Sequence, residues 1–443
     1  MCRPLSPHPR DCPVNPIQRG FDILRREGPR SLVVKVNRGV QRSIRILRSD
    51  GIGAVSLRAA RKIQSGLLTQ RISMLVDARD AVAVDWTVIP AHHRTPPTVD
   101  SGSVEIAWLM SPPGRESGGH QNLFRFIDFA ERAGHRCTIY LYHTAGTPEL
   151  SDLRAMLAQT DAYAQVSAEI RIYDRDAGVD PSTQAIFATG WETAYPVFLD
   201  RTEARRFYFI QDFEASFYPL GSESLLAGNT YRFGFHGISA GGWLAKKLHD
   251  DYGMHMDHFD FAVDKSRYHV TNFGPRHEVF FYARPVTSRR AFEFGLLVLG
   301  EFARLEPDVV INLAGWDVSN WEIPFPHTNL ASLEISQLNE VYNRCGVGLV
   351  LSLSNMSLLP LELISSGVAP VVNDAPNNRL VSDNPNIEYV PLSPKRIAQR
   401  MAEVLRRKDA VERSIAMSAS VAKIDWEDSG TQFTDAFEKA MRG

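Results

Sequence analysis

A single acid interrupts the apolar run "MSLLPLELISSGVAPVV", which begins at residue 356. Pro360 suits the first position of a helix and Gly367 its end, so Glu362 falls in the first helical turn, and a strand is predicted to follow over residues 369–373. A carboxylate there can accept hydrogen bonds from hydroxyl groups, and a helix N-terminus favours its ionised form. The alternative is that Glu362 only complements the helix dipole.

Three arginines are placed where an anion could be held. Arg284 ends the predicted strand "VFFYAR", and Arg289 and Arg290 stand at the start of the helical pattern that follows. A guanidinium group can bind phosphate in a bidentate way, and a helix N-terminus also attracts anions. These residues predict contact with a phosphate group; the alternative is a cluster of arginines on the surface.

Acids follow two predicted strands of the preceding part of the chain. The segment "QDFEAS" places Asp212 and Glu214 just beyond one strand, and "GWET" places Glu192 beyond another. Acids at such positions can bind sugar hydroxyls or act as a general base toward an incoming hydroxyl group. The alternative is that they cap helices or pair with the many arginines.

Two glycine pairs stand between a predicted strand and a predicted helix. Gly118 and Gly119 follow the first strand, with His120 next to them, and Gly241 and Gly242 follow "FGFHGISA". Without side chains, the backbone amides can approach a phosphate or sugar closely. His120 could contact the same ligand, although a histidine at a helix start often has a structural role.

The elements that must position these residues repeat in two series. The first series starts near residue 103, and the second starts after Gly274 and Pro275. The predicted strands are continuous apolar runs such as "VEIAWLM", "RFYFIQD", "VFFYAR" and "VGLVLS", which is typical of parallel sheets covered on both faces. We expect two doubly wound α/β units that face each other, with a ligand in the cleft at the carboxyl ends of the strands.

The chain's charge is unevenly distributed. Residues 1–75 hold fifteen Lys or Arg and four Asp or Glu, although the whole chain has a formal charge of −2. Within residues 19–75, arginines alternate with apolar residues at mixed helical spacings, which favours broken amphipathic helices. This basic arm is predicted either to contact anionic lipid or to pack on the acidic remainder of the chain.

Several other classes of protein are disfavoured. The net charge argues against bulk nucleic-acid binding, and no apolar run reaches the roughly 20 residues of a membrane span. The Pro- and Arg-rich start does not have the apolar core of a secretory signal, so we expect a cytoplasmic protein. The four cysteines lack metal-ligand spacing, and there is neither an Asp-x-Asp pair before a strand nor a P-loop lysine, so no metal and no ATP hydrolysis are expected.

The motifs resemble one group of enzymes. The stretches "VFFYARPVTSRRAFEFG" and "LNEVYNRCGVGLVLSLSNMSLLPLELISSGVAPVV" resemble the C-terminal half of the retaining glycosyltransferases with a GT-B fold commonly called family four. The stretches "SGGHQNLFRFIDFAERAGH" and "FYFIQDFEASFYPLGSESLLAGNTYRFGFHGISAGGWLAKKL" are similar to the same group. The closer likeness, over roughly residues 103–430, is to bacterial rhamnosyltransferases of S-layer glycan and polysaccharide assembly.

The resemblance implies a role for several of these residues. Glu362 matches the acid that accepts hydrogen bonds from the donor's ribose, and Arg284 matches the phosphate-binding arginine, with Arg289 or Arg290 near its basic partner. Many relatives carry a further acid about eight residues before the first, where this chain has Ser354 and its neighbours Asn355 and Met356. A neutral Asn355 can still bind a sugar hydroxyl, and this departure argues against simply transferring the usual hexose specificity.

The resemblance thus implies a GT-B fold with two facing Rossmann-like domains and a basic N-terminal arm. The expected boundaries are 1–100 for the arm, 101–270 for the acceptor-side domain, 271–415 for the nucleotide-sugar domain and 416–443 for a helix packed across both. The expected reaction transfers L-rhamnose from dTDP-L-rhamnose to a glycan or lipid-linked glycan without a metal. The alternatives are another hexose from a GDP or UDP donor, and a catalytically silent module that binds glycan or organises an assembly.

Overall fold

The computed structural model describes residues 74–94, 96–99, 102–115, 117–142 and 149–443. Amphipathic helices were predicted within residues 19–75, and of these only residues 74 and 75 are described. Residues 74–94 pack on the first α/β domain, because Val76 and Val84 belong to its core and the buried Asp80 forms an ion pair with Arg175.

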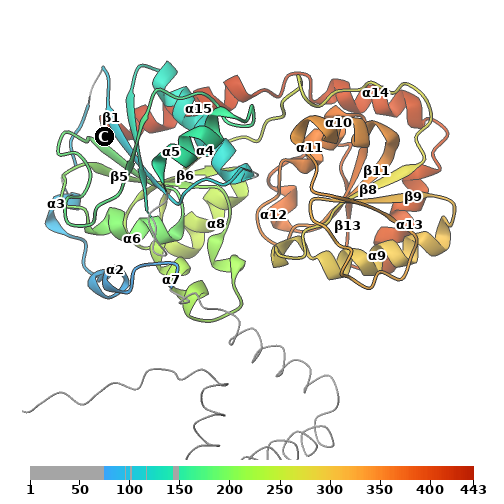
Figure 1. Cartoon of the computed structure of the whole chain (residues 1–443), viewed down its shortest axis with the longest axis horizontal. Coiled ribbons are helices and arrows are strands. Elements are labelled where there is room, and N and C mark those ends of the chain that lie inside the picture. Colours follow the sequence, from blue (N-terminus) through green and yellow to red (C-terminus); the bar gives the residue numbers. More distant parts are fainter. Residues whose placement is uncertain (1–73, 95, 100–101, 116, 143–148) are drawn as a thin grey trace, which may run out of the picture. The chain divides into compact units, whose positions relative to one another are not determined.

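The first domain is built around a parallel sheet of seven strands, in the order β3-β2-β1-β4-β5-β6-β7 (Figure 1). Its strands are β1 (Glu105–Met110), β2 (Arg136–Leu141), β3 (Glu169–Ile172), β4 (Ala185–Ala188), β5 (Arg205–Ile210), β6 (His236–Ala240) and β7 (His255–Phe259). Its helices are α2 (Ala78–Ala83), α3 (Ala91–Arg94), α4 (Gly118–Arg132), α5 (Leu150–Ala158), α6 (Trp191–Leu199), α7 (Ser222–Thr230) and α8 (Gly242–Tyr252), with the 3-10 turn η1 (Glu214–Phe217).

The second domain repeats this arrangement around a parallel sheet of six strands, in the order β10-β9-β8-β11-β12-β13. Its strands are β8 (Glu278–Tyr282), β9 (Val310–Ala314), β10 (Thr328–Ala331), β11 (Cys345–Val350), β12 (Ala369–Asn373) and β13 (Glu388–Val390). Its helices are α9 (Phe292–Leu305), α10 (Ile335–Arg344), α11 (Leu359–Ser365), α12 (Pro376–Arg379), α13 (Pro394–Leu405) and α14 (Ala410–Ser420), with the 3-10 turn η2 (Ser288–Arg290).

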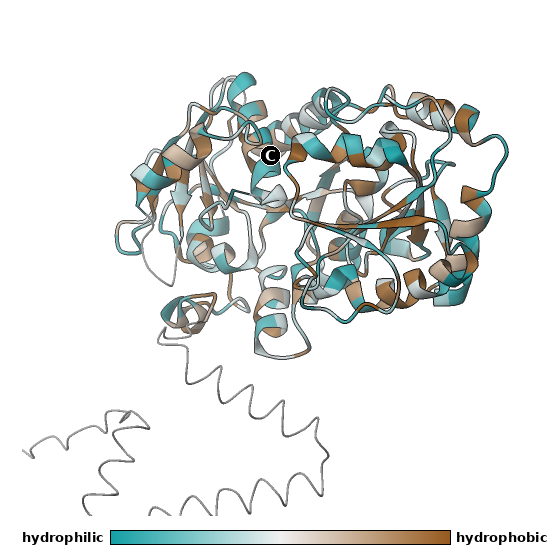
Figure 2. Cartoon of the chain, turned by 45° about the vertical axis from the view of Figure 1, so that its right-hand side comes forward, coloured by the Kyte–Doolittle hydropathy of each residue, from teal (hydrophilic) through white to brown (hydrophobic). Residues whose placement is uncertain are grey.

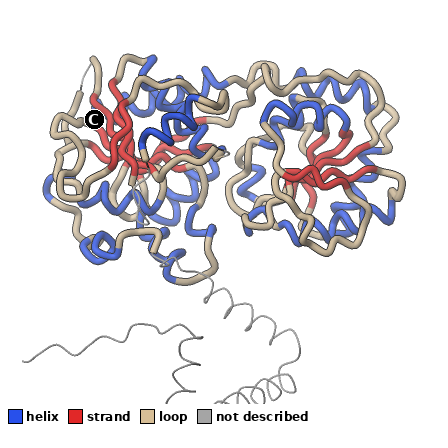
Figure 3. The backbone as a smooth tube through the Cα atoms, in the orientation of Figure 1, coloured by secondary structure: helices blue, strands red, loops and turns tan. Residues whose placement is uncertain are grey.

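The two faces of the first sheet are both buried, as the continuous apolar strands predicted. Along β1, Ile106 and Trp108 face one core cluster, whereas Ala107 and Leu109 face the other. The sheets lie between layers of helices (Figure 3), and apolar and polar residues alternate along these helices (Figure 2). An apolar face that covers a sheet explains why these sequences form helices at these places.

The last two helices pack on different domains. Helix α14 contacts α11 of the second domain, and α15 (Trp426–Arg442) returns to the first domain, where it contacts α4, β6 and β7. Phe433 and Phe437 of α15 are fully buried in the first domain's aromatic core. The chain therefore crosses between the domains twice within the described residues.

The strand order determines where a cleft forms. In the first sheet the chain runs from β1 outward to β3 and then returns to the other side of β1 as β4, and in the second sheet β8 and β11 have the same relation. Loops diverge at these reversals, so a crevice forms at the carboxyl ends of β1 and β4 and of β8 and β11. The predicted pair of doubly wound units is confirmed.

Candidate active site in the cleft between the domains

A cavity of about 1040 Å³ lies between the carboxyl ends of the two sheets. Both domains line it: α4 and the segments that follow β4 and β5 supply one wall, and the loops after β8 and β11 supply the other. Such a volume suits a ligand larger than a single sugar. The predicted site residues that line the cavity are Gly118, Gly119, His120, Glu192, Asp212, Glu214, Arg284, Arg289, Arg290 and Glu362.

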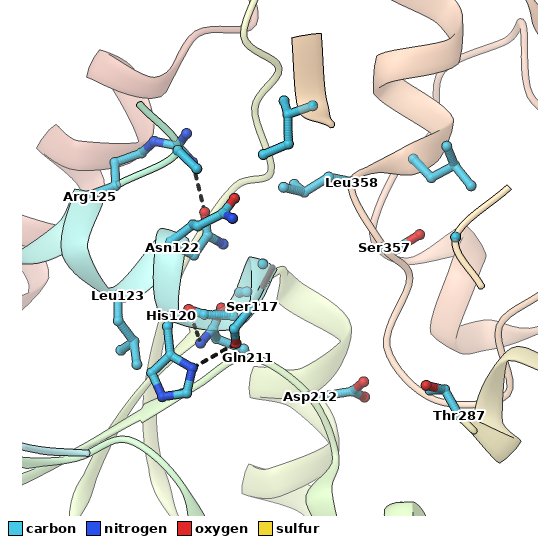
Figure 4. Close-up of a pocket in the computed structure, with 18 of the residues that line it drawn as sticks. Ser117, His120, Asn122, Leu123, Arg125, Gln211, Asp212, Thr287, Ser357 and Leu358 are labelled. Carbon is cyan, nitrogen blue, oxygen red and sulfur yellow. Dashed lines mark hydrogen bonds between the residues drawn. The ribbon is translucent and has the colours of Figure 1, made fainter. Parts of the chain in front are cut away.

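The start of α4 forms one side of the cavity (Figure 4). His120 is held at both ring nitrogens: Nδ1 lies 2.7 Å from the Ser117 hydroxyl and Nε2 lies 2.9 Å from the Ser111 carbonyl oxygen. Nε2 must donate to the carbonyl, so Nδ1 accepts from the hydroxyl, and burial lowers the pKa of His120. His120 is thus a neutral side chain that fixes the helix start, and Gly118 has open space around it.

The three predicted phosphate-binding arginines differ in their surroundings. Nη1 of Arg284 donates to the carbonyl oxygen of Gly315 at 3.2 Å, and no carboxylate among the described residues pairs with it. Arg289 pairs with Asp212 through Nε at 2.9 Å. Arg290 donates from Nη1 to the Ser352 hydroxyl at 2.8 Å, and burial lowers its pKa. Arg284 is therefore the best placed of the three to meet an anionic ligand.

Asp212 and Asn355 join the two domains. The Asp212 carboxylate accepts from Arg289 through Oδ2 and from the backbone N–H of Asn355 through Oδ1 at 2.8 Å. In return, the Asn355 side-chain amide donates to the carbonyl oxygens of Gln211 at 3.0 Å and Ala240 at 2.8 Å. Asn355 is buried and does not line the cavity. Its side chain therefore connects the two domains, whereas the sequence predicted that it contacts a sugar.

The buried Glu214 and the partly buried Glu192 are two acids in the cavity wall. Oε2 of Glu214 accepts from the Trp191 backbone N–H at 2.5 Å and from the Tyr208 hydroxyl at 3.0 Å. Burial, with a smaller contribution from Glu192, raises the pKa of Glu214 to about 8. Glu214 is then mostly neutral at pH 7, and its hydrogen bonds anchor the start of α6. Burial also raises the pKa of Glu192.

The local structure around Glu362 is the one predicted from the sequence. Helix α11 has Pro360 in its first turn, Gly367 follows it with a φ of +76°, and β12 covers Ala369–Asn373. Burial raises the pKa of Glu362 to about 7 despite the opposing effects of Tyr342 and Arg125, so the helix start does not keep this carboxyl fully ionised at neutral pH. The Tyr342 hydroxyl lies 3.4 Å from Oε2 of Glu362.

Gly241 and Gly242 do not line the cavity. Gly241 has a φ of +84°, and a Cβ there would lie 3.2 Å from Phe261 and 3.4 Å from Val381 of the second domain. This glycine therefore permits close packing of the two domains. The sequence pattern had instead predicted that its backbone amide approaches the phosphate or sugar of a ligand. A Cβ at Gly242 would meet the ring of His258 at 3.5 Å.

Arg125 is a cavity residue that sequence reasoning missed. Its guanidinium lies 4.0 Å from the centroid of the Trp426 ring and donates from Nη1 to Asn122 at 2.8 Å (Figure 4). Burial lowers its pKa to about 10, and its charge acts on Glu362 across the cleft. The partner Trp426 comes from the other end of the chain, so no local signal marks this arginine as a cavity residue.

Among the described residues, no group of three or more His, Cys, Asp and Glu side chains is arranged to hold a metal ion. Within the same residues, no helix combines the length and apolar character required to cross a bilayer.

A family model and a curated protein are similar to parts of this chain. Residues 277–402 match the family model "WsaF, C-terminal domain". The chain is 31% identical over 338 residues to the O-antigen biosynthesis protein RfbC of Myxococcus xanthus, with 74% of this chain and 26% of that protein covered. The chain thus spans about a quarter of the length of this curated relative.

Solved structures establish the fold. The chain is similar to a mutant of S. aureus TarM in complex with Fondaparinux, alpha-GlcNAc-glycerol and UDP, with a TM-score of 0.61, 8% identity, and 77% and 100% of the two chains covered. It is also similar to Anabaena HepE in complex with UDP and glucose, with a TM-score of 0.57, 14% identity and 75% and 99% coverage. Together with the two parallel sheets, these likenesses show a GT-B fold.

Proposed function

We propose that this chain is a glycosyltransferase that moves a sugar from a nucleotide-sugar donor to a hydroxyl group of a glycan acceptor, and that the donor is dTDP-L-rhamnose. The observation that carries the proposal is the cavity between the domains, where Arg284 has no described acidic partner and Glu362 belongs to the same lining. The match to the WsaF C-terminal domain and the likeness to the O-antigen protein RfbC support a substrate of polysaccharide assembly.

The proposed reaction breaks the bond between the anomeric carbon of the sugar and the diphosphate oxygen, and it forms a bond from that carbon to the acceptor oxygen. The acceptor's proton leaves with the diphosphate when attack occurs on the same face, so no enzyme nucleophile is required. Arg284 stabilises the charge that develops on the leaving diphosphate. Glu362 accepts hydrogen bonds from the ribose, and the start of α4 contacts the sugar from the opposite domain.

Exclusion of water matters because water competes with the acceptor for the activated sugar. The hydrogen bonds of Asp212 and Asn355 hold the two domains together beside the cavity. We infer that breaking and re-forming these contacts accompanies entry of the donor and release of the nucleotide. Asp212 then helps to hold the two domains together. Both of its carboxylate oxygens already accept hydrogen bonds, which does not favour the predicted role of general base.

The first test is the thermal stability of the full chain with dTDP, UDP, GDP and ADP, followed by transfer assays with the corresponding activated sugars. A ligand at about 100 times its Kd adds roughly 2.7 kcal/mol to the folded state. A selective response to dTDP and turnover of dTDP-L-rhamnose are expected. A response only to UDP or GDP would overturn the assignment of dTDP-L-rhamnose as the donor. No turnover with any donor would favour the alternative of a catalytically silent module.

The basic segment 19–75 is proposed to contact anionic lipid, which would place the enzyme at the inner face of the cell membrane while it remains cytoplasmic. Each basic residue near such a surface contributes about 1 kcal/mol. Co-sedimentation of the full chain with vesicles of anionic lipid, but not with vesicles of neutral lipid, is the expected result. Equal sedimentation with both would contradict the proposal.

A further inference from the structure

A second cavity, of about 870 Å³, opens beside the first. Its walls come from η1, the loop that follows it, α7, the end of α8 and the loop after β11. We refer to it as the α7 groove, and its main apolar residues are Phe213, Tyr218, Leu220, Leu225, Tyr252 and Leu353.

The α7 groove exposes apolar side chains to an unusual degree. Leu220 is 100% exposed, Leu225 is 65% exposed and Leu353 is 50% exposed. Leu220 and Leu225 belong to the first domain and Leu353 to the second, so the exposed aliphatic surface is shared by both. Apolar surface that lines a hollow commonly marks a binding site, because burying it on a ligand is favourable.

The charge in the α7 groove is one-sided. Arg232 and Arg289 line it, whereas no Asp or Glu is among the described residues in its wall. Arg289 is neutralised by Asp212. Arg232 is exposed, lies 4.5 Å from the centroid of the Tyr252 ring and donates to the carbonyl oxygen of Gly228, and no described carboxylate pairs with it. An occupant with an apolar chain and an anionic group fits this surface.

The α7 groove is continuous with the proposed active site. Tyr218 and Arg289 line both cavities, so one molecule can extend from the groove to the reacting centre. A glycan segment alone fits the exposed leucines less well, because aliphatic side chains offer no hydrogen-bond partners for sugar hydroxyls.

We propose that the α7 groove binds the lipid phosphate part of the acceptor, an apolar chain linked through phosphate to the glycan. This assignment rests on the proposed function, since it requires that the glycan of the same molecule reaches the first cavity. The leucines contact the chain, and Arg232 pairs with the phosphate.

Binding is tested with dodecyl phosphate below its micelle concentration, measured by calorimetry on the full chain. Leu220→Asp and Leu225→Asp should each weaken binding about tenfold, because a buried leucine contact is lost and a like charge is added. The matched control is Leu297→Asp on α9, a residue that is 61% exposed and outside the groove. Arg232→Gln should weaken binding of dodecyl phosphate but not of neutral dodecyl maltoside.

Two outcomes of this binding experiment would overturn the assignment. If both groove variants bind dodecyl phosphate as the wild type does, the α7 groove does not hold the chain. If Arg232→Gln weakens dodecyl phosphate and dodecyl maltoside equally, the groove does not select an anion.

Transfer assays separate this inference from the proposed function. One sugar acceptor is presented both as its dodecyl phosphodiester and as its methyl glycoside. Leu220→Asp should lower kcat/KM for the dodecyl form about tenfold and leave the methyl form unchanged. An equal loss for both forms would make the groove a glycan subsite and overturn the lipid assignment. No transfer by the wild type to either form would instead count against the proposed function, whatever the binding results.

Discussion

The protonation of Glu362 gives the most direct test of the candidate site. Burial raises the pKa of this carboxyl from 4.5 to about 7, and Tyr342, Arg125 and Asp264 are the polar and charged groups that act on it. Such a change corresponds to about 3 kcal/mol between the two protonation states. The folded protein holds this proton more tightly than the unfolded chain, so the stabilisation is complete below about pH 4.5 and is lost as the pH rises to about 7.

The substitution Glu362→Gln keeps the shape and the hydrogen-bond acceptor but carries no charge. At pH 8 the variant should therefore be more stable than the wild type by up to about 3 kcal/mol, whereas at pH 5 the two should differ by less than about 1 kcal/mol. For a protein of this size the difference at pH 8 should appear as a few degrees in Tm.

The assay is thermal unfolding of both proteins from pH 5 to pH 8 without nucleotide. Glu340→Gln on α10 is the matched control, because the side chain of Glu340 is 81% exposed, and it should show no such pH dependence. If Glu362→Gln is less stable than the wild type at pH 8, or if its difference from the wild type is the same at every pH, the reasoning about burial is refuted.

Three further predictions concern neighbouring residues. Arg284→Ala should lower kcat at least about a hundredfold, because it removes the charge that stabilises the leaving diphosphate. The control is Arg304→Ala on the same domain, which should not change kcat because the Arg304 side chain is 76% exposed. Equal turnover of the two variants would contradict the role of Arg284 in stabilising the diphosphate. Asp212→Asn should tighten dTDP binding severalfold if Arg289 is freed for the diphosphate, and titration of dTDP that shows unchanged affinity would remove Arg289 from the site. Glu214→Gln should cost less than about 1 kcal/mol at pH 7, since the carboxyl is already mostly neutral, whereas Glu214→Ala should cost about 2 kcal/mol or more by leaving two buried donors unpaired; equal denaturant midpoints for these two variants would refute this account.

The composition and order of the chain were enough to predict its architecture. Continuous apolar strands alternate with amphipathic helices in two series, and a parallel sheet that is covered on both faces requires this pattern. The helix from Leu359 to Ser365 and the strand from Ala369 to Asn373 were predicted within two residues. Pro360 and Gly367 mark these boundaries through backbone preferences that depend on near neighbours alone.

The partners of the site residues were decided only by tertiary structure. Asp212 meets the backbone of Asn355, which is 143 residues away, and Arg125 meets Trp426 near the other end of the chain. The raised pKa of Glu362 likewise arises from its burial in the folded protein. Local backbone preference and apolar periodicity are properties of adjacent residues, whereas burial and contacts across a cleft exist only once the two domains have come together.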